Sequence, residues 1–148
     1  MTMYEMPGVS ESRETFENEF LWGGGEHEIP KLEKQAVIDG SARDSANSLT
    51  HHLRPGLLLG KVTATNKLKE FDPDAVDGTE TLYGVLPVEL VLKDVEGNDQ
   101  DAVCPVIVTA PVKIKNLLLK GAAVVGNADE QAVRDGLNAK RFYIDDEF

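Results

Sequence analysis

Apolar and polar residues alternate along the chain from Leu58 onward, and this is the clearest structural signal in the sequence. On an extended chain, the alternation places Leu58, Gly60, Val62 and Ala64 on one face and Leu59, Lys61, Thr63 and Thr65 on the other. A period of two residues predicts a β-strand with one buried face. The segment from Asp72 to Gly78 (DPDAVDG) is rich in residues that favour turns. The pattern therefore predicts a strand, a turn, and a second strand through Thr79, Thr81, Tyr83 and Val85.

The β-type pattern continues after Leu86. A short alternating run covers Val88 to Lys93, and a longer extended run covers Ala102 to Lys115, with prolines at 105 and 111. Proline cannot donate a hydrogen bond to a β-ladder, so we expect the longer strand to lie on a sheet edge or to carry bulges. An exposed apolar edge promotes aggregation, and oligomerisation is one way of covering it.

Helical periodicity is strongest near the C-terminus. Asn127 followed by Glu130 has the spacing of a capping box, and we predict a helix from Ala128 to about Lys140. Its apolar stripe consists of Ala132, Val133, Gly136 and Leu137. A short strand at 141–144 and an acidic tail at 145–148 follow. The predicted class is mainly β (α+β), a small β-barrel or β-sandwich-like domain with one C-terminal helix.

Two periodicities fit the segment Lys31 to Ile38. Leu32, Ala36 and Val37 would share a helical face, whereas Leu32, Ala36 and Ile38 would share a strand face. The segment Asp39 to Asn47 (DGSARDSAN) has the composition of a loop. Its length in so small a domain suggests an exposed excursion over a neighbouring subunit.

Residues 1–30 are predicted to form a flexible N-terminal arm that precedes a β-rich domain over residues 31–148. The first nineteen residues are polar and acidic and have no sustained period. Phe20, Leu21 and Trp22 follow abruptly, with three glycines after them. Two interpretations are open for Trp22, the only tryptophan. It either folds back and caps the core of its own chain, or it is an anchor that enters a pocket on a partner.

The charge balance narrows the classes of partner. The chain has 148 residues, 15 Lys and Arg, 26 Asp and Glu, and a net charge of −11. An acidic protein gains nothing from counterion release, so we expect no direct nucleic-acid binding. No apolar run reaches the roughly 18 residues that span a bilayer, so we expect no membrane association. A single cysteine permits no intrachain disulfide, which is typical of a protein made in a reducing cytoplasm.

Groups that would carry catalysis or bind a metal are sparse. No phosphate-binding, dinucleotide-binding or nucleophile-elbow motif is present, and we predict no catalytic residues, no cofactor and no enzyme activity. Glu26-His27-Glu28 and His51-His52 lack the spacing of a metal motif, and we predict no metal site. Adjacent histidines would project to opposite faces of a strand. Cys104 lies in an apolar run and is interpreted as a small buried hydrophobic residue rather than a nucleophile.

The string GLLLGKVTAT…K…FDPDAVDGTET…GVL resembles the lambda-like bacteriophage head decoration proteins, which are small β-rich proteins on the outside of a DNA-filled capsid. The matching positions are Gly56, Leu58, Leu59, Gly60, Lys61, Val62, Thr63, Thr65, Lys67, Asp72, Pro73, Asp77, Gly78, Thr79, Gly84, Val85 and Leu86. A looser likeness continues to the C-terminus. The resemblance also favours an extended conformation for Lys31 to Ile38.

This resemblance implies a function. The protein would be a capsid decoration (cementing) protein, a homotrimer that binds the major capsid protein on the outer surface of the mature phage head and stabilises it against internal DNA pressure. Its N-terminal segment would contact the capsid by adding an extended strand to a neighbouring chain. The candidate capsid-binding residues are Phe20, Leu21, Trp22 and Ile29. The protein would be made in the host cytoplasm and located in the virion.

A second interpretation belongs to another class of function. The domain could be a β-barrel binding module that recognises a carbohydrate or a host surface. Such sites usually present exposed aromatic residues, and the chain has only five Phe, three Tyr and one Trp. We expect most of these aromatic residues to lie in the core. An uncharacterised small hydrolase is the third interpretation, and it would require Cys104 or an acidic pair to line a pocket with a perturbed pKa.

Overall fold

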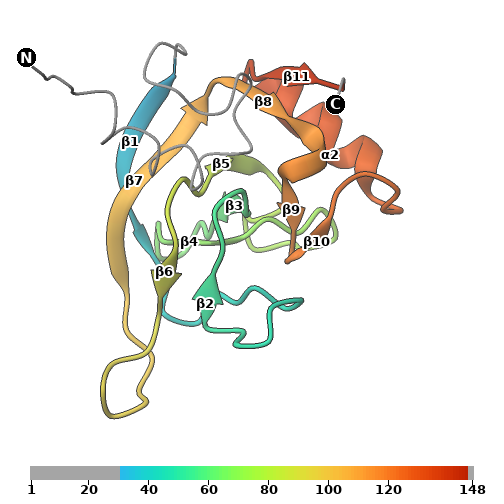
Figure 1. Cartoon of the computed structure of the whole chain (residues 1–148). Coiled ribbons are helices and arrows are strands. Elements are labelled where there is room, and N and C mark those ends of the chain that lie inside the picture. The colour runs from blue at the N-terminus through green and yellow to red at the C-terminus, as the bar shows by residue number, and fades with distance from the viewer. Residues whose placement is uncertain (1–30, 147–148) are drawn as a thin grey trace, which may run out of the picture.

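Five strands close into a β-barrel in the computed structural model, which describes residues 31–146. Their order around the barrel is β1 (Leu32–Ile38), β4 (Leu68–Glu70), β3 (Leu58–Lys61), β5 (Leu82–Val85) and β7 (Ala102–Thr109) (Figure 1). Neighbouring strands are antiparallel except β1 and β4, which are parallel. The mainly β class is confirmed, and so is the strand at 31–38. The predicted arm lies outside the described residues.

Short paired elements surround the barrel. They are β2 (His52–Leu53) with β6 (Leu90–Val91), β9 (Leu118–Leu119) with β10 (Ala122–Ala123), and β8 (Pro111–Lys113) with β11 (Tyr143–Asp145). The 3-10 helix η3 (Ile114–Asn116) connects β8 to β9, and α2 (Glu130–Ala139) is the α-helix of the described part. Figure 1 shows β8, α2 and β11 together on one side of the barrel. The C-terminal third of the described chain therefore forms a layer against the barrel wall.

Two hydrophobic clusters form the core, one on each side of that wall. Four strands supply buried side chains to the barrel interior, where the cluster includes Ile38, Leu59, Leu68, Cys104 and Val106, and the partly buried Tyr83 of β5 packs against this cluster. The second cluster joins the outer face of the wall to the C-terminal layer and includes Leu58, Val85, Ile107, Val112, Val133, Leu137 and Phe142. Consecutive residues of one strand therefore belong to different cores, because successive side chains point to opposite faces.

The prediction of one buried face for the first strand is wrong. Leu58 and Leu59 are both fully buried, and Gly60 is buried too. The outer face of β3 is covered by residues more than fifty positions further along the chain, such as Val112 and Val133. The alternation in sequence shows which residues share a face, but it does not show that both faces are covered.

The predicted strand from residue 58 to 65 is too long. It ends at Lys61, and a turn follows in which the Asn66 N–H donates to the Val62 carbonyl at 2.8 Å. Asn66 has a φ of 60°, a left-handed conformation that asparagine tolerates. The turn leads into β4, a three-residue strand that the pattern did not predict. β3 therefore pairs with β4 on one side and with β5 on the other.

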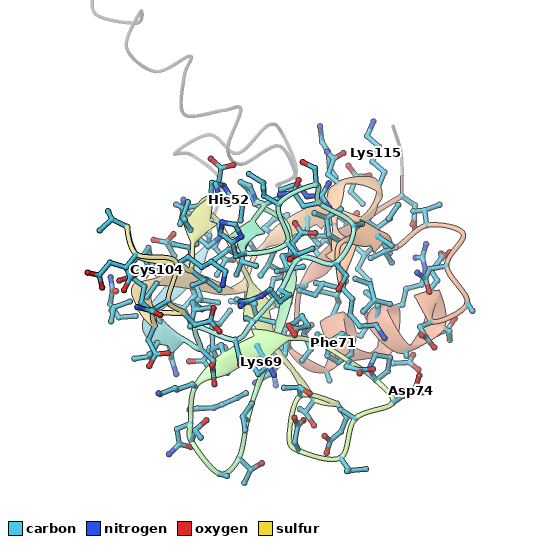
Figure 2. The ribbon with its side chains drawn as sticks, turned by 90° about the horizontal axis from the view of Figure 1, so that it is seen from below. His52, Lys69, Phe71, Asp74, Cys104 and Lys115 are labelled. Atoms are coloured by element: carbon cyan, nitrogen blue, oxygen red, sulfur yellow. The ribbon has the colours of Figure 1, made fainter. Side chains whose placement is uncertain are left out.

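The predicted second strand begins three residues late, at Leu82. The turn extends through Thr79, because the Asp77 carboxylate accepts hydrogen bonds from both the backbone N–H and the hydroxyl of Thr79. These bonds also lower the pKa of Asp77. Figure 2 shows Asp74 of this turn at the periphery, whereas Phe71 lies inside, near the helix. The short alternating run from Val88 to Lys93 contributes only β6, a two-residue strand.

The run predicted from residue 102 to 115 divides into β7, which contains Pro105, and β8, which contains Pro111. β7 pairs with β1 on one side and with β5 on the other, so the edge expectation is wrong for β7, whereas β8 pairs only with β11 among the described residues. The position of Pro105 explains how the ladder tolerates it, since β7 pairs with β5 only at Ile107, two residues further on. The expected bulge is present in β7 itself: one step in β1 from Leu32 to Glu33 corresponds to two steps in β7 from Thr109 to Ile107, so Val108 is the extra residue.

The C-terminal helix is shorter than predicted, and its cap is displaced. The Asn127 side chain accepts a hydrogen bond from the Asp129 N–H at 2.9 Å, and the Glu130 carboxylate accepts one from the Gly126 N–H at 2.9 Å. The two side chains thus fix the turn before the helix rather than its first turn. Gly136 faces the barrel, and a Cβ built there would lie 3.2 Å from the Leu82 Cβ.

The loop after β1 is anchored rather than an exposed excursion. Ala42 and Asp44 have no exposed surface, and the Asp44 carboxylate binds Arg54. The Arg43 guanidinium also donates to the Asp99 carboxylate at 2.7 Å. Loop composition did not reveal that one of its acidic residues is buried.

Candidate protein-binding surface

The four predicted capsid-binding residues, Phe20, Leu21, Trp22 and Ile29, lie outside the described residues, as does Glu26-His27-Glu28. The structure therefore does not place them. What it does place is the start of the described chain, at Lys31, directly before β1. The surface around this point is the part of the described protein closest in sequence to the predicted arm.

The first half of β1 is exposed on both of its faces. Residues 32–35 are all solvent-exposed, and Leu32 retains 55% of its accessible surface. β1 pairs with β7 along its whole length but with β4 only at Ile38. Along residues 32–37 the second edge of β1 therefore has no ladder partner among the described residues. An unpaired edge of this kind can accept an added strand.

Apolar side chains lie on the surface of the same ribbon. Val103 of β7 is 70% exposed and is the register partner of Val37 in β1. Pro105, which is half-buried, pairs with Gln35 two positions along. The β1–β7 ribbon thus combines a backbone edge that no described strand covers with exposed apolar side chains, and both features are typical of protein-binding surfaces.

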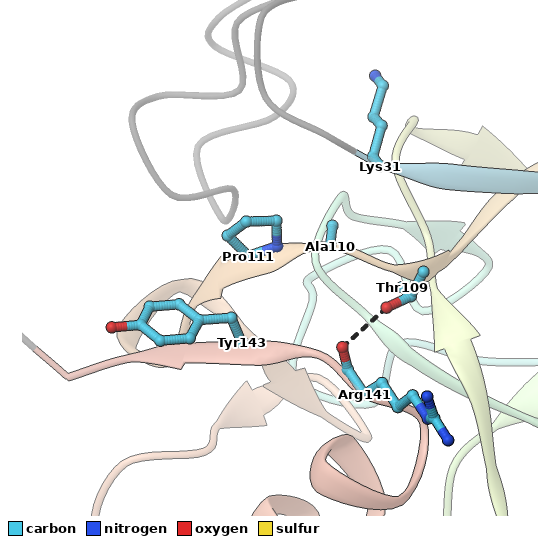
Figure 3. A pocket seen from close by; sticks show the side chains of 6 residues that line it. All are labelled: Lys31, Thr109, Ala110, Pro111, Arg141 and Tyr143. Carbon is cyan, nitrogen blue, oxygen red and sulfur yellow. Dashed lines mark hydrogen bonds between the residues drawn. The ribbon is translucent and has the colours of Figure 1, made fainter.

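A hollow of about 330 Å³ lies beside the start of β1 (Figure 3). It is lined by Lys31, Thr109, Ala110, Pro111, Arg141 and Tyr143. These residues come from three separate parts of the chain, namely the start of β1, the β7–β8 corner and the entry to β11. We refer to it below as the β8–β11 hollow.

Backbone and side-chain hydrogen bonds fix the walls of this hollow. The Tyr143 N–H donates to the Ala110 carbonyl at 3.1 Å, and the Thr109 hydroxyl donates to the Arg141 carbonyl at 2.8 Å. Arg141 has a φ of 65°, which turns the chain between the helix and β11. Phe142 then points into the core, while Tyr143 is 62% exposed. The walls are therefore part of the framework of the fold.

Sequence reasoning did not identify the β8–β11 hollow. One signal was available, since strand alternation in Arg141-Phe142-Tyr143-Ile144 puts two adjacent aromatic residues on opposite faces. One of them was therefore bound to face away from the core. The other lining residues gave no signal, because their proximity depends on the parallel pairing of β8 with β11.

A second hollow, of about 390 Å³, lies between α2 and the segment that joins β4 to β5. Its apolar part includes Phe71, Leu82 and Gly136, and its charged residues are Glu80, Asp135 and Lys140. The lining contains no cysteine, histidine or serine. It lies on a different part of the surface from β1, and it shares no residue with the β8–β11 hollow.

Many cationic side chains of the described part lie next to carboxylates. Lys67 contacts Asp101 at 2.6 Å, and Lys93 and Arg43 both hydrogen bond to Asp99, which lowers the pKa of Asp99. Arg134 contacts Glu130 and Asp146, each at 2.8 Å. A cation already paired with a carboxylate is a poor ligand for a phosphate backbone, which relies on uncompensated positive charge.

His51 and His52 do not lie on opposite faces of a strand. β2 begins only at His52, and the two rings contact each other edge to face with centroids 4.5 Å apart. Within residues 31–146, no group of three His, Cys, Asp or Glu side chains is arranged to hold a metal ion. Helices long and apolar enough to cross a bilayer are also absent from that range.

Cys104 is buried inside the barrel with 5% of its surface exposed, as the sequence predicts. Burial raises the pKa of its thiol to about 11. Because the thiolate is the reactive form, we expect iodoacetamide at pH 8 to modify folded Cys104 far more slowly than the same cysteine in urea. Mass spectrometry of timed samples measures both rates. Equal rates in the two conditions would contradict a buried, protonated thiol.

Comparison of this chain with protein-family models, with curated proteins and with solved structures found no match.

Proposed function

We propose that the protein is a capsid decoration protein of a lambda-like tailed bacteriophage. It binds the outer surface of the mature head as a homotrimer, contacts the major capsid protein, and stabilises the shell against internal DNA pressure. The observation that carries this proposal is the sequence string from Gly56 to Leu86, with its combined strand, turn and glycine positions. The role requires no catalysis and no cofactor.

The fold gives a physical reason for two glycines of that string. A Cβ at Gly60 would lie 2.6 Å from the Thr79 carbonyl oxygen, and one at Gly84 would lie 2.6 Å from the Ile107 carbonyl oxygen. Side chains cannot be accommodated at such distances, so these positions require glycine wherever the same barrel wall is built. These two glycines of the string therefore suit a small barrel of the kind that the resemblance implies.

The location of β1 suits the proposed mode of attachment. The arm of residues 1–30 joins the barrel at Lys31, at the start of the β1 edge that has no ladder partner among the described residues, while the exposed Val103 lies at the other end of the same ribbon, opposite Val37. An extended arm leaving from this point can pair with a strand of a neighbouring capsid subunit, with Phe20, Leu21, Trp22 and Ile29 as its apolar contacts. Three arms on one trimer bind with a raised effective concentration, so modest single contacts sum to durable attachment.

The charge of the chain is compatible with an external position. A net charge of −11 opposes contact with packaged DNA and permits a location on the outer surface of the virion. Arg43, Lys67 and Arg134 each lie in an ion pair with a carboxylate, so their positive charges are already compensated within the protein.

The proposal is tested by co-sedimentation with expanded, undecorated phage heads. We expect the full-length protein to bind saturably, near one copy per capsid subunit, and a variant lacking residues 1–25 to lose this binding. The physical reason is that the truncation removes the aromatic anchor while leaving the described barrel complete. A full-length variant with Phe20, Leu21 and Trp22 all changed to Ala separates loss of the anchor from loss of chain length.

The control is Val76→Ala, which truncates a side chain that is 95% exposed in the turn before β5. It should bind like the full-length protein. Binding that survives both arm variants would place the contact in the folded body and refute the assigned residues. Absence of binding by the full-length protein to any lambda-like head would refute the decoration role.

Carbohydrate or host-surface recognition is less well supported by the side chains. Of the described aromatic residues, Phe71 and Phe142 are buried, Tyr83 is half-buried, and Tyr143 is the one that is largely exposed. A single exposed ring does not make a stacking platform of the kind that sugar sites use. A glycan screen would become the next experiment only if the capsid assay failed.

A further inference from the structure

The β8–β11 hollow has the composition of a site for an aromatic side chain. Ala110, Pro111 and the ring of Tyr143 supply apolar surface, and Arg141 and Lys31 complete the lining, the Lys31 ammonium lying 3.8 Å from the Glu33 carboxylate (Figure 3). Tyrosine and arginine are both enriched at protein–protein interfaces relative to the rest of the surface. A cationic group near the face of an indole ring adds a cation–π attraction.

The chain itself supplies a matching segment at a suitable distance. Lys31 lines the hollow and is the residue at which the arm joins the barrel. Trp22 precedes Lys31 by nine positions, so the intervening chain reaches about 30 Å when extended. Gly23, Gly24 and Gly25 permit the reversal of direction that a return to the hollow requires. A tether of this length keeps the anchor at a high effective concentration beside the hollow.

We propose that in the free protein the segment Phe20–Trp22 of the same chain docks in the β8–β11 hollow, with the Trp22 ring against Pro111 and Tyr143. Docking hides the three most apolar consecutive residues of the arm from water. It also limits aggregation through the arm before a partner is reached. On a partner, the segment leaves the hollow, so docking and partner binding compete for the same side chains.

This inference rests on the proposed function in one respect only, namely that the arm binds a capsid subunit after it leaves the hollow. The docking itself is tested on the isolated protein, without capsids. A negative docking result therefore leaves the capsid proposal intact, and a negative capsid result leaves the docking intact.

The test uses the fluorescence of Trp22, the only tryptophan of the chain. We expect the full-length protein to show blue-shifted emission and protection from acrylamide quenching relative to the same protein in urea. Tyr143→Ser should shift the emission to the red and remove the protection, whereas Tyr143→Leu, which keeps apolar bulk, should retain most of it. Val76→Ser is the matched control, because it changes an exposed apolar residue outside the hollow and should leave both quantities unchanged.

A second measurement covers the case in which Tyr143→Ser unfolds the protein. In amide NMR spectra of the full chain, Trp22→Ser should shift the resonances of Ala110 and Tyr143, which lose a neighbouring ring, while the barrel resonances of β3 and β4 stay in place. The proposal is overturned if Trp22 in the native protein is quenched as in urea, or if its protection is insensitive to Tyr143→Ser in a folded variant. Protection that disappears on dilution would assign the hollow to the arm of a second copy and would also overturn docking within one chain.

Discussion

Replacement of Arg54 by leucine is expected to lower the free energy of unfolding by about 3 kcal/mol, the lower end of the range for breaking a buried ion pair, because Asp44 is fully buried whereas the Arg54 side chain retains 36% of its exposure. Asp44 has no exposed surface, and the Arg54 guanidinium donates to its two carboxylate oxygens at 2.7 and 2.8 Å. The hydrogen bond to Asp44 also raises the pKa of Arg54. Without Arg54 the carboxylate stays buried with no cation beside it, which is the costly state.

The position of this pair adds to the expected effect. Arg54 also donates to the Gly121 carbonyl at 2.7 Å, so one side chain connects the loop after β1 to the turn between β9 and β10. Gly121 has a φ of 93°, and a Cβ at this residue would collide with the Asp44 carboxylate. Leucine retains much of the volume of the arginine stem but can donate no hydrogen bond to either partner. The loss therefore concerns hydrogen bonding and charge more than packing.

Urea unfolding followed by circular dichroism measures this loss, and Lys67→Met is the control. Lys67 and Asp101 form an ion pair of similar length, 2.6 Å, but both side chains retain close to two fifths of their exposure. A surface ion pair contributes little, because water solvates both partners after it breaks. We therefore expect Lys67→Met to be much milder than Arg54→Leu. Equal effects would show that burial of Asp44 does not determine the energetics of the pair.

Leu58→Ala and Leu59→Ala are each expected to cost about 2–5 kcal/mol, the usual range for truncating a fully buried leucine. The two residues are adjacent in β3, and both have no exposed surface. Leu59 lies in the barrel interior, whereas Leu58 packs against the C-terminal layer. Each substitution leaves a cavity in a different hydrophobic cluster, and the side chains of one cluster cannot move to fill a cavity in the other.

Thermal and urea unfolding of the two variants provide the measurement, with Val103→Ala as the control from the same barrel. Val103 is 70% exposed, and its truncation should change stability by less than about 0.5 kcal/mol. A strand with one solvent-exposed face would give one damaging and one mild variant at positions 58 and 59. That outcome would contradict the two-core architecture.

Several features of the fold could be predicted from local sequence because they depend on neighbouring residues. The alternation around Leu58 indicated β-structure, and the Asp-rich segment before Gly78 indicated a turn. The spacing of Asn127 and Glu130 located the start of a helix to within a few residues. Burial of Cys104 followed from the apolar run around it. In each case the periodicity or turn chemistry of a few consecutive residues was sufficient.

The candidate site could be predicted only in part. The aromatic segment Phe20–Trp22 was identified by its composition, but it lies outside the described residues. The surface next to it was not predicted, since Lys31, Pro111 and Tyr143 meet only because β8 pairs with β11 and β1 pairs with β7. No local pattern connects residues that are 32 to 112 positions apart along the chain, as these three are.

By itself, the sequence determined that the chain forms a mainly β domain with a C-terminal helix, because strand and helix periods are local properties. The tertiary structure alone decided that the strands close into a barrel, that both faces of β3 are buried, and that Asp44 lies inside with Arg54 as its partner. Whether a face is buried depends on which distant segment covers it. Which segment covers a face depends on the packing of the whole chain. The same local pattern is therefore compatible with either a covered or a solvated strand face.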